Sequence, residues 1–269
     1  MIQGTASHVG KTTLVSAICR FLFKKNIRVC PFKPQNITSN LIDIGNNETI
    51  GYAQYLQAIS ACNIKPDARM NPVVINITGT SVDFVVKGKI LHRGGFDDYN
   101  MLLPLMKEAI VESYTSLYKE YDLIVIEGAG SPVEINRSGD DISNMWLANY
   151  FQIPVILVSN MEYGGGFASI VGTFELLENS FLSLIKGYVF NKYEGNVSLL
   201  NGGIKYIKGR YGKEFLGTFP YIANLNIPEE DFPNSANDPL TNKPTSMRFS
   251  DSFDDLAYYI KNIDLDFIY

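Results

Sequence analysis

Hydrophobic residues along this chain form short runs that alternate with longer stretches of helical spacing. Short apolar runs are typical of buried strands, and apolar residues three and four positions apart are typical of amphipathic helices. The expected strands are residues 27–31, 73–78, 82–89, 123–126, 155–158, 187–190 and 215–219. The expected helices are residues 14–22, 50–62, 98–118, 141–151, 164–178 and 253–263. This alternation predicts an α/β fold, in which a mostly parallel sheet carries helices on both faces.

Two regions depart from that alternation. The apolar runs 73–78 and 82–89 flank Gly79-Thr80-Ser81, which predicts a β-hairpin. Residues 226–250 are rich in Pro, Asn, Asp and Ser and are expected to form a long loop, followed by a closing helix over 251–263. A chain of 269 residues could form one large α/β domain or two small ones. We expect a single domain over 1–269, with its core in residues 1–231.

A phosphate-binding loop is predicted at the start of the chain. A short apolar segment leads into Gly4-Thr5, then into Gly10-Lys11-Thr12-Thr13 and an apolar helical run, which is the strand–loop–helix context of a P-loop. Five residues separate the two glycines, one more than is usual. Backbone N–H groups and the helix N-terminus attract phosphates, the lysine neutralises the β/γ oxygens, and the first threonine reaches Mg²⁺. The sequence therefore predicts binding of ATP and Mg²⁺ through Gly4, Thr5, His8, Val9, Gly10, Lys11, Thr12 and Thr13.

Composition narrows the remaining classes of function. A net charge of −5 gives no general attraction to nucleic acid or an anionic membrane, and no apolar run is long enough to span a bilayer. The three cysteines lack metal-ligand spacing and are expected to be buried free thiols in a reducing cytoplasm. With only His8 and His92, a multi-histidine metal site is excluded, and His92 is expected on the surface at a strand end.

Polar residues follow the predicted strands, where ligands of parallel sheets gather. Lys33 lies between Pro31 and Pro34, and Gln35 and Asn36 come next. A lysine held on a stiff loop beside a P-loop suits a migrating phosphoryl group, although a solvated surface lysine is the competing interpretation.

Two further strand ends carry candidate ligands. Glu127 ends the strand 123–126 as a Walker B carboxylate does, and we expect it to hold Mg²⁺. Downstream, Ser131, Glu134 and Asn136 suit a hydroxylated or carboxylated second substrate. Asn191 follows the strand 187–190 and could bond the adenine edge, with capping of a turn as the competing role.

Together these segments resemble cobyric acid synthase, in its N-terminal ATPase domain of the dethiobiotin-synthetase-like P-loop class. The resemblance covers residues 1–231, in order. Its main carriers are Gln3-Gly-Thr with Gly10-Lys-Thr, Pro31-Phe-Lys-Pro-Gln-Asn36, Gly51-Tyr-Ala-Gln-Tyr-Leu-Gln57, Met70-Asn-Pro-Val73, Glu127-Gly-Ala-Gly-Ser-Pro132 and Asp141-Ile-Ser-Asn-Met145.

The resemblance implies ATP-dependent amidation of corrin side-chain carboxylates, from cobyrinic acid a,c-diamide to cobyric acid, in cobalamin biosynthesis. ATP would form acyl phosphates, which ammonia would convert to amides. Lys11, Lys33 and Glu127 would be catalytic, Glu48 would be a further metal ligand, and Asn71 would join the substrate residues. A homodimer is also implied.

The chain departs from this family at several positions. Family members continue into a glutaminase domain with a Cys-His-Glu triad, whereas the residues after 231 contain no Cys or His. Ammonia would then be free or come from a separate glutaminase subunit, unless the chain is a fragment. Thr49 stands where the family has an acidic residue, and cations are missing at Asn76, Tyr163 and Glu194. Each lost charged contact would weaken binding of a polycarboxylate by roughly 1.5–3 kcal/mol.

Two alternatives therefore stay open. One is a related ATP-dependent ligase of the dethiobiotin synthetase or cobyrinate diamide synthase type. The other is a regulatory ATPase of the ParA/MinD type, which would carry a lysine at the position of Thr5.

Overall fold

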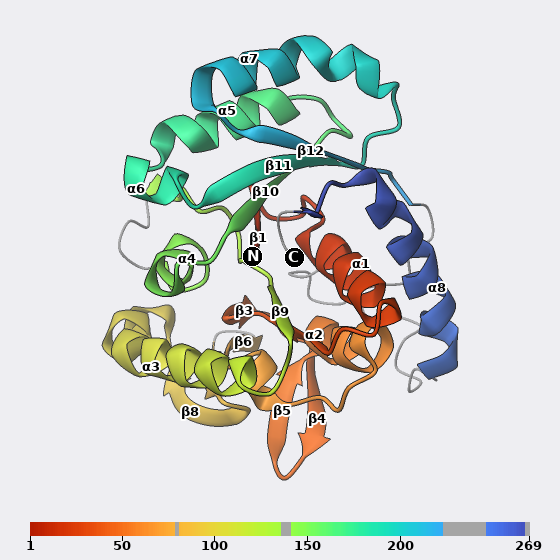
Figure 1. Ribbon diagram of the computed structural model, residues 1–269. Coiled ribbons are helices and arrows are strands. Elements are labelled where there is room, and N and C mark those ends of the chain that lie inside the picture. The colour runs from red at the N-terminus through yellow and green to blue at the C-terminus, as the bar shows by residue number, and fades with distance from the viewer. Residues whose placement is uncertain (79–80, 136–140, 223–245, 267–269) are drawn as a thin grey trace.

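The computed structural model describes residues 1–78, 81–135, 141–222 and 246–266. Its central sheet contains six parallel strands in the order β2, β9, β1, β10, β11 and β12. A bridge between Ile2 and Glu127 joins β9 to β1. The bounds are β1 Ile2–Gly4, β2 Val29–Phe32, β9 Leu123–Ile126, β10 Val155–Asn160, β11 Ile185–Asn191 and β12 Glu214–Phe219. The predicted α/β fold with a mostly parallel sheet is confirmed (Figure 1).

An outer, mixed sheet extends from the end of β2. Pro34 interrupts the chain there, and β3 (Gln35–Ile37) then pairs in parallel with β6 (Val73–Thr78). β6 pairs with β7 (Ser81–Val86), and β7 with β8 (Lys89–Gly94), both antiparallel. The predicted hairpin is thus confirmed, although the residues at its tip lie outside the described ranges. A separate hairpin joins β4 (Leu41–Gly45) to β5 (Glu48–Gly51).

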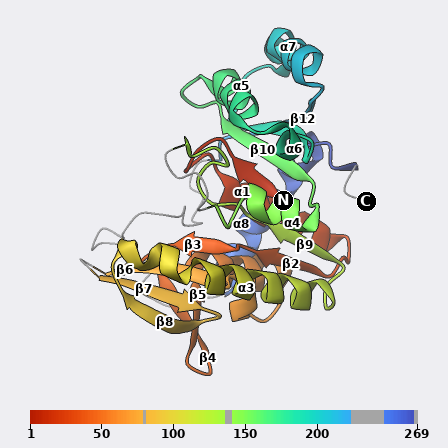
Figure 2. The same cartoon turned by 90° about the vertical axis from the view of Figure 1, so that its left-hand side faces the viewer.

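Helices cover both faces of the central sheet, as Figures 1 and 2 show. α1 and α8 lie against one face, α4, α5 and α7 cover the other, and α3 lies beside the outer sheet. Their bounds are α1 Lys11–Lys24, α2 Tyr52–Leu56, α3 Tyr99–Tyr118, α4 Met145–Phe151, α5 Gly166–Leu176, α6 Asn179–Leu182, α7 Asn201–Tyr211 and α8 Ser246–Tyr259. A π-helix, Gln57–Cys62, continues α2, and short 3₁₀ turns occupy 68–70, 96–98, 197–200 and 260–262.

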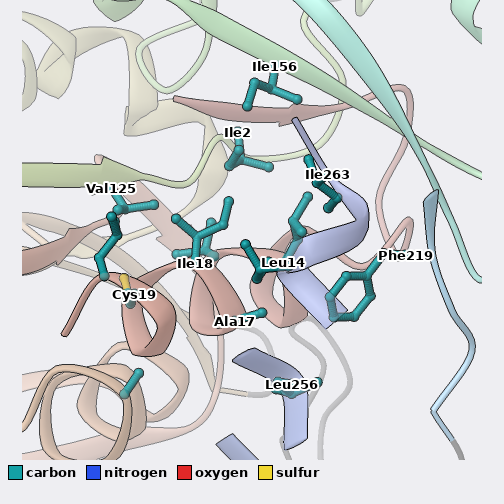
Figure 3. Close-up of a cluster of buried hydrophobic side chains, with 14 of the residues drawn as sticks. Ile2, Leu14, Ala17, Ile18, Cys19, Val125, Ile156, Phe219, Leu256 and Ile263 are labelled. Carbon is teal, nitrogen blue, oxygen red and sulfur yellow. The ribbon is translucent and has the colours of Figure 1, made fainter. Parts of the chain in front are cut away.

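Strand alternation explains why both faces are covered. In β10, Ile156 and Val158 belong to the cluster around α1 and α8, whereas Val155 and Leu157 belong to the cluster under α4, α5 and α7. Because successive side chains of a strand point to opposite faces, an entirely apolar strand needs helices on both sides. Figure 3 shows the first cluster, which contains Ile18 from α1, Ile156 from β10 and Leu256 from α8.

Several predicted boundaries were wrong. The helix expected over 50–62 begins only at Tyr52, because the preceding residues pair with β4. The helix expected from 141 begins at Met145. The strand expected over 82–89 ends at Val86, since positive φ angles at Lys87 and Gly88 turn the chain into β8, which the sequence pattern missed.

The predictions for the C-terminal part of the chain were partly right. The closing helix is confirmed as α8, which packs on α1, but it ends at Tyr259 rather than at residue 263. It begins at Ser246, so residues 246–250 are helical rather than loop. The rest of the expected loop lies outside the described residues. Within the described part of the chain, no helix is long and apolar enough to cross a membrane.

The prediction that the cysteines are buried free thiols is confirmed for Cys19, Cys30 and Cys62. Burial raises the pKa of the Cys30 and Cys62 thiols, which disfavours the reactive thiolate. His92 is half-buried within β8 rather than at a strand end, and its Nε2 lies 2.9 Å from Asp98 Oδ2.

Candidate functional site

The carboxyl ends of β1, β2 and β9 bring the predicted catalytic residues together. Glu127 follows β9, and its backbone N–H donates to the carbonyl of Phe32 at the end of β2, at 2.8 Å. The next N–H, of Gly128, donates to Ile2 in β1, also at 2.8 Å. Because parallel strands end at one edge of the sheet, three segments far apart in sequence meet at this point.

The P-loop closes over the start of α1. Gly10 has a φ of 90°, and a Cβ there would overlap the side-chain amide of Asn191. Asn191 Nδ2 donates to the Val9 carbonyl at 2.7 Å, and its Oδ1 accepts from the N–H of Lys192 at 2.9 Å. Asn191 therefore supports the loop from the end of β11. Its contact with adenine stays a prediction.

Lys11 links the P-loop to the loop after β9. Its Nζ donates to the carbonyl oxygens of Ala6, at 3.0 Å, and Gly130, at 3.2 Å. At the other end of the P-loop, the Thr5 N–H donates to the Val158 carbonyl at 2.9 Å. The first residues of α1 thus place a lysine and the helix N-terminus where phosphates bind in this type of loop.

The carboxylate of Glu127 is the centre of a buried polar group. Its Oε1 accepts from Thr12 Oγ1 at 2.8 Å and from Lys33 Nζ at 3.1 Å. Its Oε2 accepts from Gln57 Nε2 at 3.2 Å. The side chains of Lys33 and Glu127 are only 2% and 1% exposed. The competing interpretation of Lys33 as a solvated lysine is therefore wrong.

The donor set fits a magnesium ion. Thr12 Oγ1 and Glu127 Oε1 are hard oxygen atoms of the kind that bind Mg²⁺, and a hydrogen bond of 2.8 Å places them side by side. Among the described residues, no group of three or more His, Cys, Asp or Glu side chains could hold a metal. Mg²⁺ commonly binds through one or two protein oxygens and completes its shell with water and nucleotide phosphates.

The comparisons with known proteins agree with this geometry. Residues 1–232 match the family model described as the CobQ/CobB/MinD/ParA nucleotide binding domain. The chain belongs to this family. A nucleotide-binding domain of this kind accounts for the P-loop and for the carboxylate at the end of β9.

Curated relatives extend the match. The chain is 44% identical over 232 residues to the adenosylcobalamin biosynthesis bifunctional protein CobDQ of Leptospira interrogans, and 41% identical over 235 residues to the cobyric acid synthase of Vibrio parahaemolyticus. Each alignment covers 86% of this chain, but 27% of the first relative and 48% of the second. The chain thus spans half or less of the length of these relatives. The resemblance to cobyric acid synthase is confirmed over the matched residues.

Solved structures are more distant. MinD of Aquifex aeolicus is 16% identical, with a TM-score of 0.43 over 83% of this chain and 82% of that chain. The signal recognition particle receptor FtsY of Elizabethkingia anophelis is 13% identical, with a TM-score of 0.46 over 94% and 62%. These scores are too low to carry an argument.

Within this nucleotide-binding domain, the predicted substrate residues Asn36 and Asn71 belong to a network of buried amides. Asn71 Nδ2 donates to the carbonyl of Lys33 at 2.9 Å, and its Oδ1 accepts from the Gly51 N–H at 3.3 Å. Asn36 Nδ2 donates to Gln54 Oε1 at 3.2 Å, and Asn36 Oδ1 is buried without a partner. Asn71 therefore fixes the backbone that carries Lys33, and the role of Asn36 in binding substrate stays a prediction.

The other predicted site residues are less closely connected. Gln35 is buried and accepts from the Tyr99 hydroxyl at 3.2 Å. Ser131 Oγ accepts from the Val133 N–H at 3.3 Å, and Glu134 is exposed. Glu48 pairs with Lys89 at 3.6 Å on the β4–β5 hairpin, outside the hydrogen-bonded group around Glu127. Their roles stay predictions, and Asn136 lies outside the described residues.

The positions of the missing family cations also differ from one another. Tyr163 is almost fully exposed beyond β10, whereas Asn76 is partly buried in β6, and Glu194 follows β11 on the surface. Their effect on a substrate stays a prediction.

Three residues that the sequence interpretation did not assign also support the site. Gln57 holds the second oxygen of Glu127. Asn144 Nδ2 donates to the Ala129 carbonyl at 2.6 Å, and Asp141 caps α4 by accepting from the N–H groups of Ser143, Asn144 and Trp146. Gln57, Asp141 and Asn144 lie in segments that carry the family resemblance, but spacing alone could not assign their partners.

Proposed function

We propose that this chain is the ATP-dependent amidating domain of a cobyric acid synthase, which converts carboxylates of cobyrinic acid a,c-diamide to amides in cobalamin biosynthesis. The observation that carries the proposal is the convergence of Thr12 and Lys33 on Glu127 beside the P-loop. The names of the relatives support the choice of corrin as the substrate.

The residues suit phosphoryl transfer to a carboxylate. The P-loop N–H groups and Lys11 bind the β- and γ-phosphates of ATP. A substrate carboxylate oxygen attacks the γ-phosphorus as the bond to ADP breaks, and Lys33 stabilises the charge on the transferred group. Thr12 and Glu127 would hold Mg²⁺, which neutralises charge on the phosphate oxygens when bound.

The second half-reaction needs ammonia and no covalent enzyme nucleophile. The nitrogen of ammonia attacks the acyl carbon of the acyl phosphate, the carbon–oxygen bond to phosphate breaks, and the amide loses a proton. The buried thiols of Cys30 and Cys62, whose pKa values burial raises, are consistent with a mechanism that does not use them. We further propose that ammonia is the nitrogen donor and that the reaction takes place in the cytoplasm.

The test is ATP turnover with Mg²⁺ and cobyrinic acid a,c-diamide, in which ammonium is compared with glutamine and the corrin mass is followed. We expect mass changes of successive amidations with ammonium. ATP binding without any amidated corrin would reject the proposed substrate and favour a related ligase. Lys208→Gln, which changes an exposed residue of α7, is a suitable control for activity.

A further inference from the structure

Lys33 occupies a position that a cation would be expected to fill. Its ammonium group lies 3.1 Å from Glu127 Oε1, the same oxygen that Thr12 contacts at 2.8 Å. Thr12 and Glu127 are the two residues that would hold Mg²⁺. The positive charge next to this oxygen pair is therefore supplied by Lys33.

Charge balance argues against Lys33 and a divalent cation sharing Glu127. A buried carboxylate with one ammonium group is neutral, and the pair is almost completely excluded from water. A divalent ion at the same oxygen would repel the ammonium group strongly, because burial leaves little solvent to screen like charges. Nucleotide phosphates at the P-loop would at the same time offer the ammonium group a new anionic partner.

The backbone of Lys33 is held by contacts that do not involve its side chain. The Lys33 N–H donates to the Met70 carbonyl at 2.8 Å, and the Lys33 carbonyl accepts from Asn71 Nδ2. On the opposite side of the carboxylate, Gln57 holds Glu127 Oε2. Both partners of the ion pair are thus anchored by contacts that do not depend on the pair itself.

We propose that Lys33 is a stand-in cation: it neutralises Glu127 in the metal-free protein and leaves the carboxylate when a divalent cation takes its place. Released in this way, the ammonium group becomes available to the transferring phosphoryl group only after the metal has arrived. Gln57 is the positioning residue that keeps Glu127 in place during the exchange. This inference rests on the proposed use of Mg²⁺ and ATP.

The exchange makes a prediction about metal affinity that is independent of turnover. Because Lys33 competes with the metal for Glu127, its removal should tighten metal binding. We expect Lys33→Gln to lower the dissociation constant for Mn²⁺, measured by electron paramagnetic resonance, at least tenfold relative to the parent protein. The measurement is made first with Mn²⁺ alone and then with a non-hydrolysable ATP analogue. The matched control is Lys208→Gln, which removes an exposed lysine paired with Glu214 and should leave the affinity unchanged.

Thermal unfolding of Lys33→Gln, with and without Mn²⁺, is a second readout. Without metal, Lys33→Gln leaves a buried carboxylate uncompensated, so its Tm should fall below that of the parent protein. Saturating Mn²⁺ should then raise the Tm of Lys33→Gln more than that of the parent. Lys33→Met, which cannot replace the hydrogen bond, should show the same two effects.

The outcomes separate the two levels of the proposal. Equal or weaker Mn²⁺ binding by both Lys33 variants, with normal binding by the parent, would overturn the exchange and leave the proposed function standing. Absence of Mn²⁺ and nucleotide binding in the parent protein itself would overturn both. Glu127→Gln added to Lys33→Gln should abolish the tighter Mn²⁺ binding of the single variant. Tight Mn²⁺ binding by this double variant would place the metal elsewhere and reject the exchange.

Discussion

The edge of the central sheet and the outer sheet use the same kinds of residue in different ways. At the ends of β1, β2 and β9, Lys33 and Glu127 form an ion pair that is excluded from water, with Thr12 and Gln57 as further partners. In the outer sheet and the β4–β5 hairpin, Lys89 pairs with Glu48 and Arg93 pairs with Asp83, and both cations are largely exposed.

Burial determines what each kind of pair can do. An exposed pair contributes about 0–1 kcal/mol, because water and salt screen it and the side chains lose entropy. A buried pair is often no more stabilising than apolar residues, but the removal of one partner costs about 3–5 kcal/mol. The loss of one partner should therefore matter most in the central pair, and the outer pairs are replaceable.

The largest expected effect is the loss of Glu127. Glu127→Ala leaves the ammonium group of Lys33 buried without its counter-ion, and we expect the free energy of unfolding in urea to fall by about 3–5 kcal/mol. Glu48→Ala, the matched change in the outer region, should cost at most about 1 kcal/mol. Equal losses of unfolding free energy in Glu127→Ala and Glu48→Ala would contradict the proposed difference between the buried and the exposed pairs.

A smaller effect is expected from crowding at the same edge. A Cβ on Gly128 would overlap Asn144 Oδ1, so Gly128→Ala should destabilise the protein by about 1–3 kcal/mol. Gly209→Ala in α7, where the added Cβ meets nothing, should instead stabilise by about 0.5–1 kcal/mol.

Chemical denaturation of Gly128→Ala, Asn144→Ala and the double variant measures the coupling between these two positions. We expect the combined loss to be smaller than the sum of the single losses, because removal of the Asn144 amide makes room for the new methyl group. Strict additivity would show that the overlap is relieved in another way.

Next in size is the support of Lys33 by Asn71. Asn71→Ala removes a buried hydrogen-bond partner of the Lys33 carbonyl and the Gly51 N–H. We expect the free energy of unfolding to fall by about 1–3 kcal/mol. ATP turnover should fall further than this loss of stability alone would cause, with kcat affected more than KM. Thr78→Ala, at an exposed position of β6, should change the free energy of unfolding by no more than about 0.5 kcal/mol. An unchanged kcat in folded Asn71→Ala would contradict the positioning role.

The smallest expected effect concerns the packing of α8 on α1. Hydrogen bonds from Arg20, with a further contribution from Lys24, lower the pKa of Asp254 in the folded protein. A lowered folded-state pKa means that this stabilisation is present above the unfolded value, about 3.9, and is lost as the pH falls through the lower folded value.

Asp254→Asn should therefore reduce the free energy of unfolding at pH 7 by less than about 1 kcal/mol, because the pair is partly exposed. Near pH 2–3 the difference from the parent protein should shrink. Urea unfolding at both pH values checks this, and a difference that grows in acid would contradict the assignment.

Much of the fold followed from hydrophobic spacing. The apolar runs that became β9, β10 and β11, and the periodic stretches that became α1 and α3, were long or regular enough to be recognised. The short strands β3 to β5 and β8 were missed, because their form depends on pairing with neighbours that local spacing does not contain.

The amino-acid sequence by itself determined the phosphate-binding loop and the types of residue at the strand ends, because the loop and the start of α1 with Gly10, Lys11 and Thr12 are formed by consecutive residues. Only the tertiary structure decided that Thr12, Lys33 and Gln57 converge on Glu127. Those four residues come from segments that parallel strand pairing brings together, and hydrogen bonds across such distances in sequence leave no periodic signal.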